Sequence, residues 1–223
     1  MNTSVVNFLK KSPFALYAAA FIYSLFYGSN VWRYVFNKNV IIKGAFLKHT
    51  KINVVKDGKL YLGARCQMNH CQIKVLGGGI WVNGRQTCIN NASLLTRESD
   101  SLIEIGEDFS MQGGTIQGVK PIRIGNHCML SWDIEILSSD LHPIFLTENN
   151  QLINQPKGII IQDHVWISAH ARVLKGSFIV HDVVVGNSSL VSGKLENSYS
   201  VYAGIPARCI KRDINWSRSW NEL

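Results

Sequence analysis

The stretch "IQDHVW ISAHAR VLKGSF IVHDVV VGNSSL VSGKLE", residues 161–196, decides the fold of this chain. The first position of each six-residue block is aliphatic: Ile161, Ile167, Val173, Ile179, Val185 and Val191. The fifth position is small or β-branched in most blocks. Helices repeat every 3.6 residues and strands every two, so neither explains a sustained period of six. A parallel β-helix does, because three six-residue faces form one coil and stacked coils bury the repeated aliphatic side chain.

The same period recurs upstream, at Ile124, Leu130 and Ile136 and, more faintly, in the pairs Leu62/Met68 and Val82/Cys88. These positions predict an all-β protein whose parallel β-helix covers residues 40–206. An apolar helical segment, residues 1–39, precedes it, and a C-terminal tail, residues 207–223, follows.

The period is interrupted briefly by residues 76–80, "LGGGI", and at greater length by residues 137–158, which contain "SSDLHPIF". Loops of this length inside a compact repeat usually carry function, because a stacked β-helix itself is inert. Pro143 biases the preceding residue, His142, toward an extended backbone. The sequence therefore predicts a protruding active-site loop, and the alternative is an ordinary surface histidine.

The chain has 23 basic and 15 acidic side chains, a net charge of +8. This surplus favours an anionic partner, but no Lys/Arg-rich tract indicates nucleic-acid binding. Its five cysteines are odd in number and form no C-x-x-C pair. They predict free thiols in a reducing compartment, the cytoplasm, and neither disulfides nor a metal site.

An apolar run extends from Pro13 to Tyr27. It is shorter than the ~20 residues that span a bilayer, and no signal-peptidase site follows it. We expect a helix lying in the membrane interface, peripheral on the inner membrane face and anchored by Tyr17, Tyr23, Tyr27 and Trp32. The alternatives are a helix packed on its own or a neighbouring subunit, and a true span or signal.

The six-residue blocks, "DLHPIF", "VWISAHARVLKG" and "YAGIPARCIKR" together resemble the hexapeptide-repeat acyltransferases that use acetyl-CoA. The resemblance covers roughly residues 100–216 and is greatest to bacterial sialic-acid capsule O-acetyltransferases. It implies a left-handed β-helix, a homotrimer with sites at the subunit interfaces, acetyl-CoA as co-substrate and no metal. It also implies an acceptor hydroxyl on an anionic bacterial surface glycan such as a polysialic acid capsule.

Within this resemblance His142 is the general base, since acetyl-CoA is already an activated thioester and histidine titrates near neutral pH. Asp140 or a backbone carbonyl would orient its ring. Gln112 is similar in position to an active-site amide of relatives and would donate to the oxyanion, or else it is a polar turn residue. Trp166 has the spacing from the histidine seen in capsule-modifying relatives. It would contact the pantetheine or the acceptor, or else pack in the trimer.

The resemblance also implies a cofactor groove between subunits. Its pantetheine arm would be lined by Ala169, Asn187 and Ser192. Ala203 and Gly204 would permit close approach of the adenine end. The phosphates of acetyl-CoA would meet basic side chains of the tail, Arg208, Lys211 and Arg212.

Three other functions remain open at the level of sequence. The same chemistry could act on a small acceptor, such as a free sugar, a sugar nucleotide or an antibiotic. A γ-type carbonic anhydrase would need three histidines that converge at an interface, for which His164, His170 and His181 lie in the correct region. A non-enzymatic scaffold would leave the His142 loop unexplained.

Overall fold

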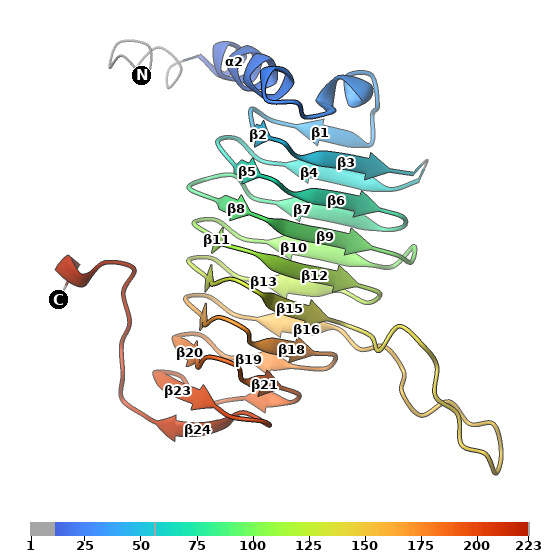
Figure 1. The fold of residues 1–223 in the computed structure, drawn as a ribbon, viewed down its shortest axis with the longest axis vertical. Coiled ribbons are helices and arrows are strands. Elements are labelled where there is room, and N and C mark those ends of the chain that lie inside the picture. The colour runs from blue at the N-terminus through green and yellow to red at the C-terminus, as the bar shows by residue number, and fades with distance from the viewer. Residues whose placement is uncertain (1–11, 56, 223) are drawn as a thin grey trace.

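The computed structural model describes residues 12–55 and 57–222, and its body is a single parallel β-helix of about eight turns (Figure 1). Three sheets, here called A, B and C, form the faces of a prism, and successive strands visit them in turn. Sheet A contains β1 (Val40–Ile42), β4 (Lys59–Leu62), β7 (Gly79–Val82), β10 (Leu102–Ile105), β13 (Ile122–Ile124), β16 (Ile159–Ile161), β19 (Phe178–Ile179) and β22 (Lys194–Leu195).

Sheet B contains β2 (Phe46–Lys48), β5 (Gln67–Asn69), β8 (Cys88–Asn90), β11 (Ser110–Met111), β14 (Met129–Leu130), β17 (Trp166–Ile167), β20 (Val183–Val185), β23 (Ser200–Ala203) and β24 (Arg208–Lys211). Sheet C contains β3 (Lys51–Val54), β6 (Gln72–Val75), β9 (Ala92–Thr96), β12 (Gly114–Gly118), β15 (Ile134–Leu137), β18 (Arg172–Leu174) and β21 (Leu190–Val191). The pairing of β23 with β24 is antiparallel, and the other strand pairs of the described chain are parallel.

The predicted core of the six-residue blocks is confirmed. All six aliphatic first positions are buried, as are the five predicted fifth positions, Val165, Ala171, Ser177, Val183 and Ser189. The ladder of sheet A places Ile124 beside Ile161 and Ile161 beside Ile179, so the repeated side chains stack directly. Burial of this column of stacked aliphatic side chains stabilises the solenoid, because it removes their apolar surface from water.

The fourth position of the first five blocks forms a corner between faces, whereas that of the sixth block, Lys194, begins β22. His164, His170, Asp182 and Ser188 have φ between 55° and 60°, and Gly176 has φ 77°. Histidine, asparagine and aspartate tolerate this left-handed region better than bulkier residues. The histidines and aspartates of the blocks are therefore explained first as corner residues.

One of the faint upstream pairs was predicted wrongly. Cys88 is half-buried and directed outward, whereas its neighbour Ile89 is fully buried and pairs with Met68 and Met111. The corner between β7 and β8 contains one extra residue, so the inward residue that follows Val82 is Ile89 and not Cys88. The coils of the N-terminal half are irregular for this reason.

Helix α2 (Pro13–Phe26) lies across the N-terminal end of the prism (Figure 1). The Ser12 side chain accepts from the amide of Ala15, and Pro13 occupies the first turn, as is typical of a helix start. A short 3₁₀ helix, η1 (Val31–Tyr34), leads into β1. Within the described ranges, no helix combines the length and the apolar character needed to cross a bilayer. Residues 1–11 of the predicted N-terminal segment lie outside the described residues.

The long loop is confirmed as a protrusion. It leaves sheet C after β15, returns to sheet A at β16 and projects well away from the prism (Figure 1). The chain after β24 returns along the prism as an extended tail that ends in a second 3₁₀ helix, η2 (Trp220–Glu222). Loop and tail lie on opposite sides of the solenoid in this view.

Candidate active site

His142 stands on the protruding loop, close to where the loop leaves the prism. Its side chain is exposed, and its ring has no hydrogen-bond partner among residues 12–55 and 57–222. A pocket of about 430 Å³ adjoins it, walled by loop residues and by two turns of the corner between sheets C and A, at Arg97, Glu98 and Val119. A free imidazole beside a pocket of this size can reach a ligand bound there.

The base of the loop is held by the side chain of Asn154. Its amide nitrogen donates to the backbone oxygen of His142 (2.9 Å) and to the carboxylate of Asp140 (2.8 Å). Its amide oxygen accepts from the backbone N–H of Ile144 (2.7 Å). One side chain thus bonds to three points around His142 and fixes the direction in which the loop presents it.

Asp140 does not contact the His142 ring. Its carboxylate pairs with the ammonium of Lys175 on the next turn of the solenoid, and Lys175 also donates to the Asn154 backbone oxygen (3.1 Å). The hydrogen bonds from Lys175 and then Asn154 hold the pKa of Asp140 below its usual range. The carboxylate therefore stays ionised, and continues to brace the loop, until the pH falls below the ordinary carboxyl value of ~4. A role for Asp140 in orienting the imidazole stays a prediction.

Gln112 lies at another corner, between sheets B and C. Its amide oxygen accepts from Asn90 (3.0 Å), whose own amide oxygen accepts from Asn69 (2.7 Å), so three amides form a ladder along this corner. Because its oxygen is used, the NH₂ group of Gln112 faces solvent as a free donor at the end of the ladder.

Trp166 on β17 is half-buried, and the chain's own tail covers part of it. The ring of Trp216 lies 5.9 Å from the ring of Trp166 and stacks on His164 at 4.3 Å. Trp216 also donates its indole N–H to the backbone oxygen of His164 (3.0 Å). The indole N–H of Trp166 is buried and has no hydrogen-bond partner in the described chain. Such an unpaired buried donor is costly, so Trp166 is a polar group that the described chain leaves unsatisfied.

The residues predicted to bind acetyl-CoA surround the C-terminal coils. Ala169 and Asn187 stack at the corner between sheets B and C, where the Ser188 amide donates to the Ala169 oxygen (2.9 Å). Ser192 lies after β21, at the corner between sheets C and A. Ala203 and Gly204 follow at the end of β23, and the exposed Arg208 and Lys211 lie on β24.

In one protomer these residues form two separate groups. His142, Asp140 and Ser192 belong to the corner between sheets C and A, whereas Gln112, Trp166 and Asn187 belong to sheet B or its border with sheet C. Figure 1 shows the loop and the sheet B strands β11, β20 and β23 on opposite sides. A single chain therefore does not bring the two groups together.

The three histidines considered as metal ligands are divided between corners. His164 and His181 both hydrogen-bond Asp182 (2.6 Å each), whereas His170 pairs with Asp133 (2.8 Å) on a different corner. Among the residues that the structure describes, no three His, Cys, Asp or Glu side chains gather closely enough to hold a metal ion. All five cysteines are free thiols.

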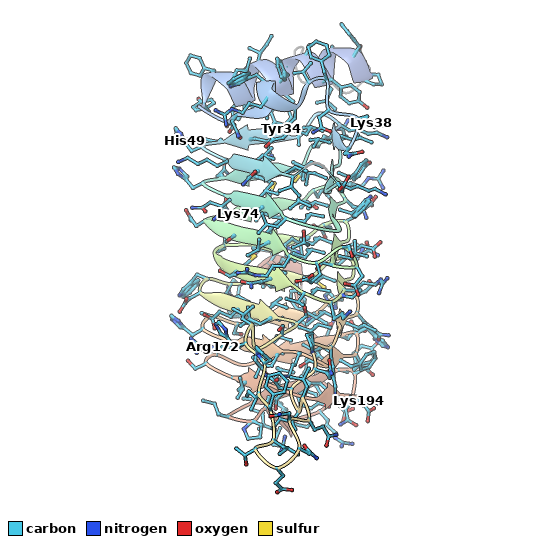
Figure 2. The ribbon with its side chains drawn as sticks, turned by 90° about the vertical axis from the view of Figure 1, so that its right-hand side faces the viewer. Tyr34, Lys38, His49, Lys74, Arg172 and Lys194 are labelled. Atoms are coloured by element: carbon cyan, nitrogen blue, oxygen red, sulfur yellow. The ribbon has the colours of Figure 1, made fainter. Side chains whose placement is uncertain are left out.

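Sequence reasoning missed Arg97, Lys175 and the aromatic cover supplied by Trp216. Arg97 has no ion pair or side-chain hydrogen bond with the described chain, and it lines the His142 pocket. Two basic residues that flank the loop, Arg172 and Lys194 (Figure 2), are already paired with Glu135 and Glu196. The strand register would have located Arg97. Thr96 pairs with Gly118 on the next turn, so Arg97 lies at the same corner as the loop and two turns before it.

A β-helix of six-residue blocks with a histidine loop is the architecture of a hexapeptide-repeat acyltransferase. No family model matches the chain. A polysialic acid O-acetyltransferase of Neisseria meningitidis is 32% identical over 172 residues, which cover 76% of this chain and 80% of the relative. The chain belongs to this family, the hexapeptide-repeat acetyltransferases related to polysialic acid O-acetyltransferases, and it is an acetyltransferase.

Two solved structures share the fold. The polysialic acid O-acetyltransferase OatWY has a TM-score of 0.67 and 27% identity, covering 81% of this chain and 87% of its own. The polysialic-acid-specific acetyltransferase NeuO has a TM-score of 0.62 and 22% identity, covering 79% of this chain and 92% of its own. The predicted family and fold are therefore confirmed.

Proposed function

We propose that the protein transfers the acetyl group of acetyl-CoA to a hydroxyl of an anionic bacterial surface glycan of the polysialic acid type, with His142 as general base. The observation that carries this proposal is the free imidazole of His142 beside a pocket lined by Arg97, which forms no ion pair with the described chain. The relationship to a polysialic acid O-acetyltransferase supports the same acceptor class.

The reaction needs one proton transfer and one acyl transfer. An imidazole nitrogen of His142 takes the proton from the acceptor hydroxyl as its oxygen attacks the thioester carbonyl. The tetrahedral intermediate then expels the CoA thiolate, which receives that proton back from the imidazolium. The products are the acetyl ester and CoA thiol, and no covalent enzyme intermediate is required.

Gln112 and Trp166 would complete the site around the thioester. The free NH₂ group of Gln112 suits an oxyanion donor, because preorganised amide donors stabilise the charge that develops on the carbonyl oxygen. The buried, unpaired indole N–H of Trp166 is a second donor that lacks a partner in the isolated chain. Both features are consistent with a neighbouring molecule that completes this surface.

We propose a homotrimer whose active sites lie between subunits. In this arrangement the His142 loop of one subunit meets sheet B of its neighbour, where Gln112, Trp166 and Asn187 stand. The separation of the two groups within one protomer supports this assembly, because neither group alone contains both a base and an oxyanion donor. Free thiols support a cytoplasmic location.

Acetyl-CoA would lie in the groove between subunits. The pantetheine arm would pass Ala169, Asn187 and Ser192, and the adenine end would pass Ala203 and Gly204. Arg208 and Lys211 are exposed on β24 and have no ion pair in the described chain, so they are available to phosphate oxygens. No metal takes part in the proposed reaction.

The acceptor preference is proposed to come from Arg97. An exposed guanidinium can bind a carboxylate through two parallel hydrogen bonds, and each sialic acid unit of such a polymer carries one carboxylate. Since Arg172 and Lys194 are neutralised by their own acidic partners, Arg97 is the cation available at the pocket among the described residues.

The test is release of CoA thiol from acetyl-CoA, with and without polysialic acid, for the wild type and His142→Ala. The expected result is polymer-dependent release that falls by roughly 10²-fold or more in the variant. Turnover that survives His142→Ala would contradict the base assignment. Turnover with a free sugar or sugar nucleotide but not with the polymer would favour a small acceptor.

Mixing two inactive variants tests the site between subunits. His142→Ala and Trp166→Ala protomers, refolded together, should form trimers in which some interfaces carry both wild-type residues. Activity should therefore reappear on mixing. If mixed trimers form and stay inactive, both residues act within one subunit and the proposed interface is wrong.

A further inference from the structure

We propose that the N-terminal end of the β-helix is a docking surface for an anionic lipid bilayer. This surface, here called the cap, comprises helix α2, η1 and the first turn of the solenoid, residues 13–54. The proposal concerns where the enzyme is held and is independent of the reaction that it performs.

The outward face of α2 is entirely apolar. Leu16, Ala20 and Ser24 turn toward the solenoid, and the Ser24 hydroxyl accepts from the amide of Leu47 (3.1 Å). The exposed positions 13, 14, 17, 18, 21, 22, 25 and 26 carry the sequence Pro, Phe, Tyr, Ala, Phe, Ile, Leu and Phe. An ordinary surface helix has a polar outer face, and a helix that is apolar all round is buried or lies in a membrane.

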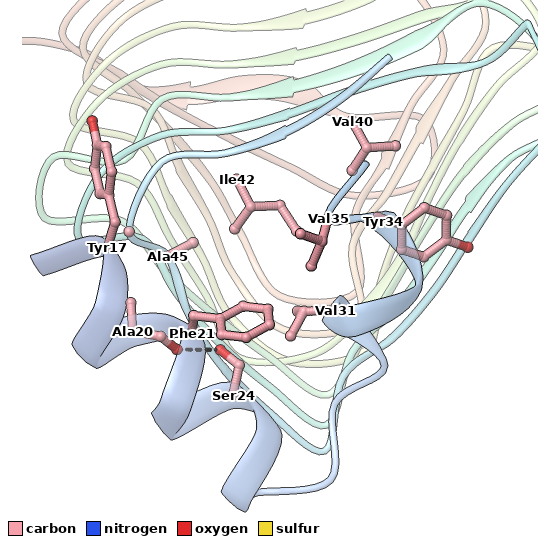
Figure 3. A pocket seen from close by; sticks show the side chains of 11 residues that line it. Tyr17, Ala20, Phe21, Ser24, Val31, Tyr34, Val35, Val40, Ile42 and Ala45 are labelled. Atoms are coloured by element: carbon pink, nitrogen blue, oxygen red, sulfur yellow. Dashed lines mark hydrogen bonds between the residues drawn. The ribbon is translucent and has the colours of Figure 1, made fainter. Parts of the chain in front are cut away.

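The exposed apolar surface continues beyond the helix. Large side chains exposed on the cap include Phe14 (82%), Ile22 (65%), Phe26 (82%), Trp32 (60%), Val35 (55%) and Phe36 (100%). A pocket of about 450 Å³ opens between the helix and the first turn, and Tyr17, Phe21 and Val35 line it (Figure 3). Contiguous apolar surface of this kind marks a binding face.

The net positive charge of the chain is concentrated in the part of the sequence that contains the cap. Residues 1–56 contain eight of the 23 basic side chains and none of the 15 acidic ones. The remaining 15 basic side chains are matched by 15 acidic ones, so the whole net charge of +8 arises from this quarter of the sequence. Within the described part, Arg33, Lys38, Lys43, Lys48 and Lys51 form no ion pair.

The exposed apolar surface and the unpaired cations together favour an anionic bilayer over a second copy of the chain as the partner of the cap. An apolar face with aromatic residues and unpaired cations complements an anionic bilayer surface, where apolar side chains enter the acyl boundary and cations meet the head groups. Two caps from two copies would instead bring like charges together. Figures 1 and 2 both show the helix across the end of the prism, so subunits packed side by side along the sheets leave its outer face free.

The test is sedimentation of the protein with vesicles. One set is phosphatidylcholine alone, and in the other about a third of the lipid is phosphatidylglycerol. Binding should be strong to the anionic vesicles, weak to the neutral ones and reduced by salt. Phe14→Ser/Phe26→Ser/Phe36→Ser should lower the partition coefficient more than about ten-fold, since three exposed aromatic side chains no longer insert.

A charge variant and a matched control sharpen the result. Lys38→Gln/Lys43→Gln should lower binding to anionic vesicles about 25-fold, at about five-fold for each charge. Ile22→Ser should weaken binding, whereas Ile210→Ser, equally exposed at 66% against 65% but distant from the cap, should not. Circular dichroism melting would show that each variant is folded.

Three outcomes would overturn the proposal. The first is wild-type protein that stays in solution with anionic vesicles. The second is equal binding by the triple aromatic variant. The third is that neither the wild type nor the triple variant binds vesicles, while the triple variant has a lower mass than the wild type by light scattering. This result would identify a second copy of the chain as the partner of the cap.

Discussion

Replacing Asn154 by alanine should disable the active-site loop while leaving the solenoid intact. The substitution removes the three hydrogen bonds to Asp140, His142 and Ile144. Each such bond contributes a net ~0.5–1.5 kcal/mol, and the lower half of that range applies here because the loop is largely exposed to competing water. The ordered loop should therefore lose about 1.5–3 kcal/mol relative to its open forms.

This loss should be seen in catalysis and not in global stability. Every ~1.4 kcal/mol changes a rate or population ten-fold, so kcat should fall about 10- to 100-fold when the ordered loop is no longer the favoured form. The loop contributes no side chain to the hydrophobic core of the prism, so the midpoint of thermal unfolding should change little. The assay is CoA thiol release at saturating acetyl-CoA, together with a melting curve.

Asn149→Ala is the matched control in the same loop. The Asn149 side chain accepts one local hydrogen bond, from the backbone N–H of Gln151 (2.9 Å), and contacts neither Asp140 nor His142 through such a bond. It should keep kcat within about two-fold of the wild type. Wild-type kcat in Asn154→Ala would refute the argument that this side chain presents His142, and so would a loss equal to that of Asn149→Ala.

Three further substitutions or treatments test other parts of the structure. Arg97→Ala should raise KM for an anionic glycan about ten-fold with kcat little changed, because one charge-assisted contact is lost; an unchanged KM in steady-state kinetics would remove Arg97 from the acceptor site. Phe109→Ala should lower the free energy of unfolding by ~3–5 kcal/mol in urea titration, because the ring is fully buried, and a loss below ~1 kcal/mol would contradict this packing. Burial raises the pKa of Cys128 to about 12 and that of Cys71 to about 11. Iodoacetamide at neutral pH should therefore leave both thiols unmodified until the protein unfolds. Rapid alkylation of either thiol in the native protein, detected by mass spectrometry, would contradict their burial.

The sequence predicted the solenoid well because its determinants are local and repeated. Each of Ile161, Ile167 and Val173 is fixed by the same six-residue rule, and errors do not accumulate while the spacing is regular. Cys88 was misplaced because one inserted corner residue shifts the inward position, and a single sequence gives no independent sign of such an insertion. The N-terminal half is therefore where prediction by period fails.

The candidate site was less accessible to the same reasoning because its contacts join distant turns. The partnership of Asp140 with Lys175 depends on how the loop folds back across the prism, which no spacing encodes. The contact of Trp216 with His164 and Trp166 depends on the path of the tail. The division of the site into two groups follows from topology, and only the stacked sheets reveal it.

The tail has a mechanical consequence for the whole solenoid. In a repeat array each turn contacts only its neighbours, so the terminal turn can peel away first. Here the Ile214 amide donates to Tyr199 on the last turn, Trp216 is bonded to His164, and Arg218 donates to Ser110, Asp108 and Cys128 several turns away. A pulling force at the C-terminus would therefore act first on the contacts of the tail with these middle turns, and only then on β24. The solenoid should resist turn-by-turn unfolding from this end and unfold in fewer, larger steps.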